Sequence, residues 1–198
     1  MRPQRLCLNL LAAALLAAQI GSSALAQPTP APAPTAGGPN INPLRIETRG
    51  PDVFIRFTLL GALNPDLAGR IEAGLETTIL YDIRLYRRHQ YWFDRLIDSR
   101  RYRVSVTYDP VTREYVVAET MDGKPLRRTT TRDFAQAARR LLSQENLLVF
   151  RVGPRDPRRN LLVNMRATFD SGYLFTIIPV NSRSPWKKSK RFNVRETP

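Results

Sequence analysis

The sequence is poor in cysteine, histidine and lysine. It has 198 residues with one cysteine, Cys7, one histidine, His89, and only four lysines. Cys7 lies in a segment that we expect to be removed. A mature chain without cysteine has no disulfide, no thiol nucleophile and no cysteine-ligated metal. His89 follows two arginines, and its nearest candidate co-ligands are the carboxylates of Asp82 and Asp94. One histidine among cations makes a poor metal site, so we interpret His89 as structural.

The motifs of common catalytic and cofactor sites are also missing. There is no Gly-x-Ser-x-Gly nucleophile turn, no glycine-rich phosphate loop and no zinc-binding histidine pair. Asp94 and Asp98 could form a carboxylate pair, but Arg95, Arg100 and Arg101 stand beside them, and surface ion pairs are the simpler explanation. We therefore predict no catalytic residue, no metal and no cofactor. A hydrolase-like envelope enzyme is kept as an alternative, because catalytic carboxylates can be far apart in sequence.

No apolar stretch of the chain reaches the about 20 residues of a membrane-spanning helix. Residues 1–26 instead predict a secretory signal peptide. Two arginines stand near its start, residues 10–18 are apolar, and Ala24-Leu25-Ala26 matches the small-x-small cleavage pattern. We expect cleavage after Ala26 and export to the periplasm or cell envelope.

The rest of the chain divides into a linker and one domain. Residues 27–43 alternate proline with alanine and have no apolar cluster, which predicts an extended linker. Residues 44–198 are numerous enough for a single domain with its own core and a basic C-terminal tail. The formal net charge is +14, and nearly all the basic residues are arginine. We attribute the scattered arginines to coding preference and keep an anionic partner as the explanation for clusters.

Alternation of apolar and polar residues predicts strands in the middle of the domain. It is clearest over residues 79–86 and 102–108, and a turn at residues 109–112 leads to a strand at 114–117. Shorter runs predict further strands at residues 44–47, 53–60, 147–152, 161–169 and 173–180. A turn is expected at residues 121–125, and a tight hairpin at residues 170–172.

Two helices complete the expected fold. Asn64-Pro65-Asp66 has the N-cap, first-turn proline and acidic residue of a helix start. A second helix is predicted from Thr131 to Gln144, capped by Thr130 or Thr131. Strands joined by tight turns predict one α+β domain, mainly an antiparallel β-sheet with two packed helices.

Several segments follow one another as in a known family. They are Tyr91-Trp92-Phe93-Asp94, residues 107–116, the helix start at Asp133-Phe134, and residues 184–189 before Arg191-Phe192. In this order they resemble an exported bacterial family known as domain-of-unknown-function family 4390. The resemblance would cover Leu44 to Val194. It implies an envelope or periplasmic protein without established activity, and it supplies no catalytic residues.

One candidate binding segment interleaves cations with aromatic residues: Arg87, Arg88, Tyr91 and Trp92. Single-stranded nucleic acids are bound by this mixture, through base stacking and phosphate contacts. The same mixture arises when a strand alternates between an aromatic core face and a charged outer face. The export signal argues against nucleic acid, so we prefer another envelope surface as the partner.

The second candidate is the basic tail, where Lys187, Lys188, Lys190 and Arg191 stand between Trp186 and Phe192. Polybasic segments with flanking aromatic residues suit a peripheral contact with an anionic membrane. A last strand with solvated lysines and with aromatic residues capping the core has the same pattern. We favour the strand and expect Trp186 to close the core.

These observations lead to three hypotheses for the function. The leading one is a non-enzymatic exported domain that binds another envelope component, a protein or an anionic surface. The alternatives are the envelope enzyme and a protein that binds anionic polymers or membrane surfaces through its basic tail. A deep pocket lined by two or more buried carboxylates would favour the enzyme.

Overall fold

The computed structural model describes residues 38–170 and 183–195. They form β1 (Asn40–Arg49), β2 (Asp52–Leu60), α1 (Pro65–Glu72), β3 (Thr77–Arg87), β4 (Arg95–Asp109), β5 (Glu114–Met121), β6 (Lys124–Thr131), α2 (Phe134–Leu142), β7 (Ser143–Arg151), β8 (Leu161–Asp170) and β9 (Lys187–Lys188). The predicted signal peptide, most of the predicted linker and the strand predicted at residues 173–180 lie outside the described residues.

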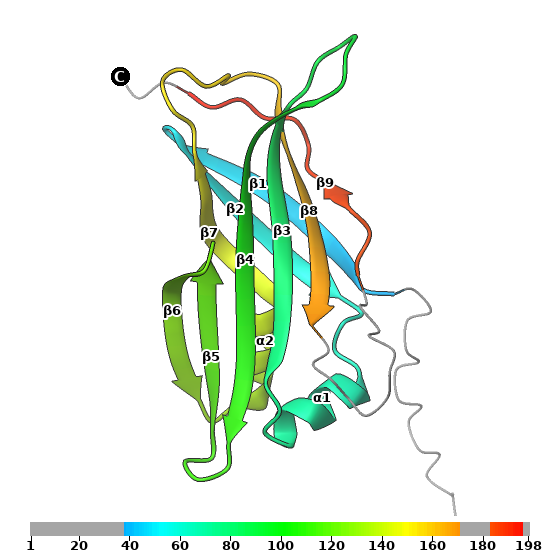
Figure 1. The fold of residues 1–198 in the computed structure, drawn as a ribbon, viewed down its shortest axis with the longest axis vertical. Helices are drawn as coiled ribbons and strands as arrows, with labels where there is room; N and C mark the ends of the chain where they lie inside the picture. Colours follow the sequence, from blue (N-terminus) through cyan, green and yellow to red (C-terminus); the bar gives the residue numbers. More distant parts are fainter. Residues whose placement is uncertain (1–37, 171–182, 196–198) are drawn as a thin grey trace, which may run out of the picture. The chain divides into compact units, whose positions relative to one another are not determined.

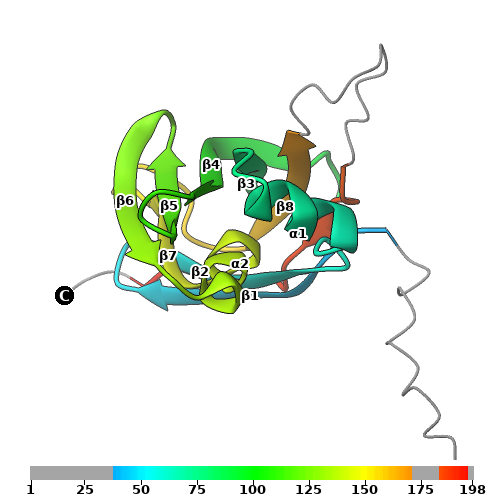
Figure 2. The ribbon, with the colours of Figure 1, turned by 90° about the horizontal axis from the view of Figure 1, so that it is seen from below.

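The strands form two sheets, and every strand pair in them is antiparallel. One sheet has the order β1-β2-β7 and the other the order β6-β5-β4-β3-β8-β9. The smaller sheet crosses one face of the larger, and both helices lie at the same end of the sheets (Figures 1 and 2). This confirms the predicted α+β class, mainly antiparallel with two helices.

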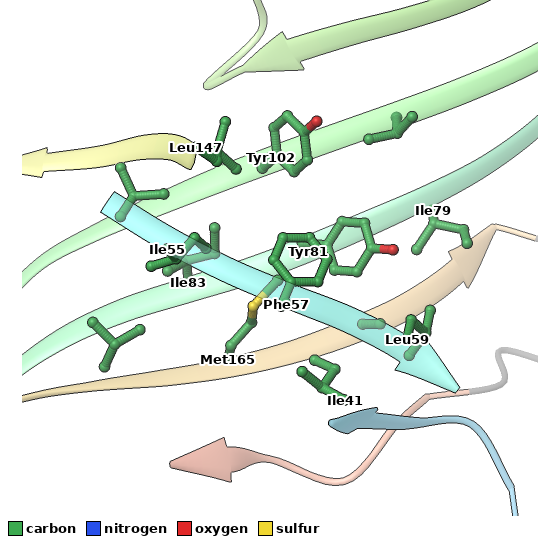
Figure 3. Close-up of a cluster of buried hydrophobic side chains, with 14 of the residues drawn as sticks. Ile41, Ile55, Phe57, Leu59, Ile79, Tyr81, Ile83, Tyr102, Leu147 and Met165 are labelled. Carbon is green, nitrogen blue, oxygen red and sulfur yellow. The ribbon is translucent and has the colours of Figure 1, made fainter. Parts of the chain in front are cut away.

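The core lies between the two sheets. Alternate residues of β2 and β3 face each other there, as the period of two predicts. The ring of Phe57 on β2 lies 4.7 Å from that of Tyr81 on β3, and Tyr81 lies 5.9 Å from Tyr102 on β4. Figure 3 shows β2 crossing over β3 and β4 with these side chains between them. A β2 side chain such as Ile55 is almost fully removed from water, which contributes about 2 kcal/mol to stability.

The first helix is capped as predicted. The Asn64 side-chain oxygen accepts a hydrogen bond from the backbone N–H of Leu67 at 2.8 Å, and Pro65 occupies the first turn. The second helix is shorter than predicted, because Asp133 rather than Thr130 or Thr131 is its N-cap, accepting from the N–H of Ala135 at 2.9 Å.

The difference in α2 arises from a strand that was not predicted. Residues 124–131 form β6, an edge strand that pairs only with β5, so Thr131 ends a strand and does not cap a helix. Most of β6 is exposed and does not alternate, so it lacks the signal used for the other strands. The Asp122-Gly123 pair before β6 is a sequence typical of a two-residue hairpin turn and could have indicated this strand. In the structure both residues have positive φ, as such a turn requires.

The folded domain also begins earlier than predicted. β1 starts at Asn40, inside the predicted linker, and Ile41 is completely buried opposite Leu59. The prolines around Ile41 concealed this strand, but proline is tolerated on an edge strand, where one side of the backbone has no pairing partner.

Candidate functional site

Three consecutive aromatic residues stand in water at the end of a β-hairpin. Tyr91, Trp92 and Phe93 are 85%, 81% and 96% exposed, and we call them the aromatic tip. They lie in the loop between β3 and β4, which extends beyond the sheets at the end away from the helices (Figure 1). By contrast, Tyr81 on β3 and Tyr102 on β4 are buried in the core, and Tyr86 and Tyr108 are half-buried. The fold therefore does not use the tip for its own packing.

The loop of the tip is held at its base. Arg87 and Arg95 are backbone partners at the end of the β3–β4 ladder, and the loop spans the seven residues between them. The N–H of Arg88 donates a hydrogen bond to the carbonyl of Asn160 at 2.8 Å, which joins the loop to the segment between β7 and β8. The tip is thus presented from a fixed base beside a second loop.

Around this base the chain gathers arginine from three segments. Arg87 ends β3, Arg158 and Arg159 come from the β7–β8 loop, and Arg195 comes from the tail. Together they line a hollow of about 880 Å³. We call these four arginines the basic end. Of the described residues, Arg87, Arg159 and Arg195 form no ion pair with another side chain.

Hydrogen bonds link the chain segments that line the hollow. Val194 N–H donates to the Arg158 carbonyl at 2.8 Å, and Asn160 N–H donates to the Asn193 side chain at 2.9 Å. The one acidic residue of the lining, Asp156, accepts from the N–H of Gly153 at 2.9 Å. The hollow is therefore a cationic recess suited to an anion.

A neighbouring arginine is already neutralised. Arg151 donates two hydrogen bonds to the Asp52 carboxylate, at 2.6 and 3.0 Å. This contact lowers the pKa of Asp52 and raises the pKa of Arg151, through the hydrogen bond first and the charge attraction second. Among the described arginines at this end, the cationic charge without a side-chain ion pair comes from Arg87, Arg159 and Arg195, not from Arg151.

The predicted basic tail is an edge strand of the larger sheet. Lys187 and Lys188 form β9 and pair with Met165 and Asn164 of β8. The prediction of a last strand with solvated lysines is confirmed, since Lys188 and Lys190 are exposed. Lys187 and Lys188 therefore lie on the edge of the sheet, and Lys187, Lys188 and Lys190 are not among the residues that line the hollow.

The predicted place of Trp186 in the core is wrong. Its ring is half-buried between the guanidinium groups of Arg84 and Arg166, whose central carbons lie 4.7 and 4.5 Å from the ring centre. Arg166 also contacts Asp82 at 3.0 Å. Asp82, Arg84 and Arg166 occupy the outer positions of β3 and β8, so Trp186 covers the outer face of the sheet. Val194 is the tail residue that enters the core.

Asp98, near the loop of the tip, forms a surface contact. Asp98 pairs with Arg100 at 2.8 Å, which confirms the surface ion pair predicted for it. Arg100 also lies 3.5 Å from Asp122. His89 is half-buried in the loop of the tip. In the described part of the chain, no three His, Cys, Asp or Glu side chains gather as metal ligands would.

One buried acid was missed by the sequence analysis. The Glu119 side chain lies inside the domain, where Tyr102 Oη donates to its Oε2 at 2.9 Å and Arg140 on α2 lies 4.0 Å from Oε1. It is the only buried acidic residue among those described, and it does not line the hollow of the basic end. Its burial could have been predicted from the sequence, because Tyr115, Val117 and Glu119 alternate inward along β5.

The structure brings together half of the predicted site. Arg87, Arg88, Tyr91 and Trp92 lie at the tip and its base, whereas Lys187 and Lys188 form β9 and Lys190 follows it. Arg191 precedes Phe192, which pairs with Leu161 at the start of β8 near the base of the loop. Phe93, Arg158, Arg159 and Arg195 were not predicted. Phe93 could have been predicted as the third consecutive aromatic residue of a loop. No feature of the sequence pointed to Arg158, Arg159 and Arg195, which are distant from it along the chain.

Comparison with known protein families gives a match. The described residues contain no helix with the length and apolar character needed to cross a bilayer. No curated protein and no solved structure matches the chain. The model of the family described as Domain of unknown function (DUF4390) matches residues 36–178. The match starts before Leu44, as β1 does, and leaves out the tail that the resemblance was expected to include. The chain belongs to this family of unknown function.

Proposed function

We propose that this protein is exported to the cell envelope and acts there by binding, with the aromatic tip and the basic end as its binding surface. The observation that carries the proposal is the exposure of Tyr91, Trp92 and Phe93, each more than four-fifths open to water. Export rests on the signal-peptide pattern of residues 1–26.

Aromatic side chains that stay exposed to water gain no stabilisation from burial unless a partner covers them. Each such side chain can bury about 150–250 Å² of surface, and contiguous apolar surface of this kind marks interaction sites. Since the tip contributes nothing to the core of this domain, folding alone gives no reason for its composition. A partner that covers the tip would recover the stabilisation that the fold leaves unused.

The chemistry around the tip limits the partner. Arg87, Arg159 and Arg195, which form no ion pair with the described residues, present positive charge beside it, and the whole chain has a formal charge of +14. Such a surface attracts anionic partners at long range and repels cationic ones. We therefore expect an envelope component with negative charge and an apolar region.

Sedimentation with isolated cell envelopes tests the proposal. The full chain is expressed, and the protein recovered from the exported fraction should have the intact mass of residues 27–198. It should sediment with envelopes, and a variant carrying Tyr91→Ser, Trp92→Ser and Phe93→Ser should remain in the supernatant.

The matched control is Val111→Ser. Val111 is also apolar and 90% exposed, but it lies in the β4–β5 turn at the opposite end of β4. This variant should sediment like the unmodified protein. Equal sedimentation of the triple-serine variant and the control would contradict the proposed surface.

A further inference from the structure

We infer, on the basis of the proposed function, that the partner is an anionic lipid surface. The aromatic tip enters the interface between head groups and acyl chains, and the hollow of the basic end takes a lipid phosphate.

The tip and the hollow lie next to each other, so one ligand surface can contact both. Arg87 lines the hollow and is also the last residue of β3, directly before the loop of the tip. The hydrogen bond from Arg88 N–H to the Asn160 carbonyl fixes that loop to the segment that supplies Arg158 and Arg159. Three exposed aromatic rings and a cationic recess therefore lie close together, at the end of the sheets from which the β3–β4 loop extends (Figure 1).

The kinds of side chain at this end match a membrane interface. Tyrosine and tryptophan are favoured at the level of the head groups, because each combines an apolar ring with a polar group. Arginine suits phosphate, because its planar guanidinium can donate two parallel hydrogen bonds to phosphate oxygens. A protein partner would need a groove that fits three projecting rings, whereas a bilayer surface accommodates them without one.

The loop also sets the depth of insertion. Its seven residues form no strand or helix, so most of their backbone N–H and carbonyl groups, other than the Arg88 N–H, need water or head groups as partners. Unpaired backbone groups do not enter the hydrocarbon layer. The contact is thus shallow, with the rings at the interface and the arginines at the level of the phosphates.

Co-sedimentation with vesicles of defined composition tests the inference. One set contains phosphatidylcholine alone, and the other contains equal parts of phosphatidylcholine and phosphatidylglycerol. We expect binding to the second set and much weaker binding to the first. The variant with Arg87→Gln, Arg159→Gln and Arg195→Gln should bind the anionic vesicles on the order of 100-fold more weakly, because each cation near an anionic surface strengthens binding about fivefold.

The tail provides the matched control for charge. Lys187→Gln, Lys188→Gln and Lys190→Gln together remove three charges from the edge of the sheet and should weaken binding much less. An equal loss in both charge variants would overturn the role of the hollow. The triple-serine tip variant should also lose vesicle binding, and its retention of binding would overturn insertion of the tip.

The two proposals fail in different ways. The protein could sediment with cell envelopes in a tip-dependent way but fail to bind anionic vesicles. That result would overturn the lipid inference. The binding surface would stand, with an envelope protein or polymer as its partner. Loss of dependence on the tip in both assays would overturn both proposals. Denaturant unfolding of every variant shows that the fold is retained, as expected for substitutions at exposed positions.

Discussion

At the scale of single residues, the buried contact between Tyr102 and Glu119 places a charged group within the core. The Tyr102 hydroxyl donates to a carboxylate that has little access to water. A nearby tyrosine, Tyr81, donates instead to the backbone carbonyl of Leu141 at 2.8 Å. Hydrogen bonds to charged groups contribute about 1.5–3 kcal/mol, against about 1 kcal/mol for neutral ones. Tyr102→Phe should therefore lower the free energy of unfolding more than Tyr81→Phe in urea denaturation. Equal losses would show that Glu119 has another donor.

The same two tyrosines make the protein sensitive to alkali. Burial raises the pKa of both hydroxyls, and the charge of Glu119 raises that of Tyr102 further. Above about pH 10 the tyrosines lose protons in the unfolded chain but keep them in the folded one, so stability falls as the pH rises. The slope should reach about 1.4 kcal/mol per pH unit for each tyrosine. Unfolding curves from pH 8 to 11 should show a shallower decline in Tyr102→Phe, and an unchanged slope would contradict this origin.

Trp186 shows how a residue's position changes the expected effect of a mutation. A tryptophan lost from a core costs about 3–5 kcal/mol. Trp186 instead packs between Arg84 and Arg166 on the outer face of the sheet, where cation–π contacts contribute at most about 2 kcal/mol. Trp186→Ala should thus lower the free energy of unfolding by about 1–2 kcal/mol. Phe57→Ala, in the core, should lower it by about 3–5 kcal/mol, and a comparable loss in the two variants would contradict this placement.

At the scale of the elements, two glycines separate the effect of backbone conformation from that of space. Nothing lies within 4 Å of a Cβ placed at either Gly69 or Gly123, so neither substitution to alanine creates a clash. Gly69 is in the middle of α1, where alanine should raise the free energy of unfolding by about 0.5–1 kcal/mol. Gly123 has a φ of +80° in the β5–β6 turn, where alanine should lower it by about 1 kcal/mol or more. Changes of the same sign in thermal melts would contradict the assigned turn.

Strands of the larger sheet could be predicted wherever one face is buried. Along β3, Ile79, Tyr81, Ile83 and Leu85 alternate inward because the core covers only one face of the sheet. The edge strand β6 has no buried face, and β1 begins between prolines, so both lacked this pattern. The aromatic tip was visible as composition, since Tyr91 and Trp92 stand among cations. The hollow was not, because Arg87, Arg158 and Arg195 meet only once β8 and the tail are paired.

At the scale of the whole molecule, the two ends of the sheets carry different elements. Both helices lie at one end, while the loop of the aromatic tip extends from the other end (Figure 1), beside the hollow lined by the basic end. Because β4 runs from the tip at Arg95 to the β4–β5 turn after Asp109, residues at its two ends are separated by a 15-residue strand. At about 3.3 Å per residue that strand is roughly 50 Å long. A surface contact at the tip therefore leaves the helical end free in solution.

The central claim, that the tip is the binding surface, is tested most directly by the fluorescence of Trp92. The chain has only two tryptophans, so Trp186→Phe leaves Trp92 as the sole tryptophan. Trp92 is 81% exposed, and its emission should start at the long wavelength of an indole in water. When cell envelopes are added, we predict a shift to shorter wavelength and weaker quenching by iodide, because the ring leaves water. Emission that stays unchanged while the protein sediments with the envelopes would show that binding occurs elsewhere on the molecule.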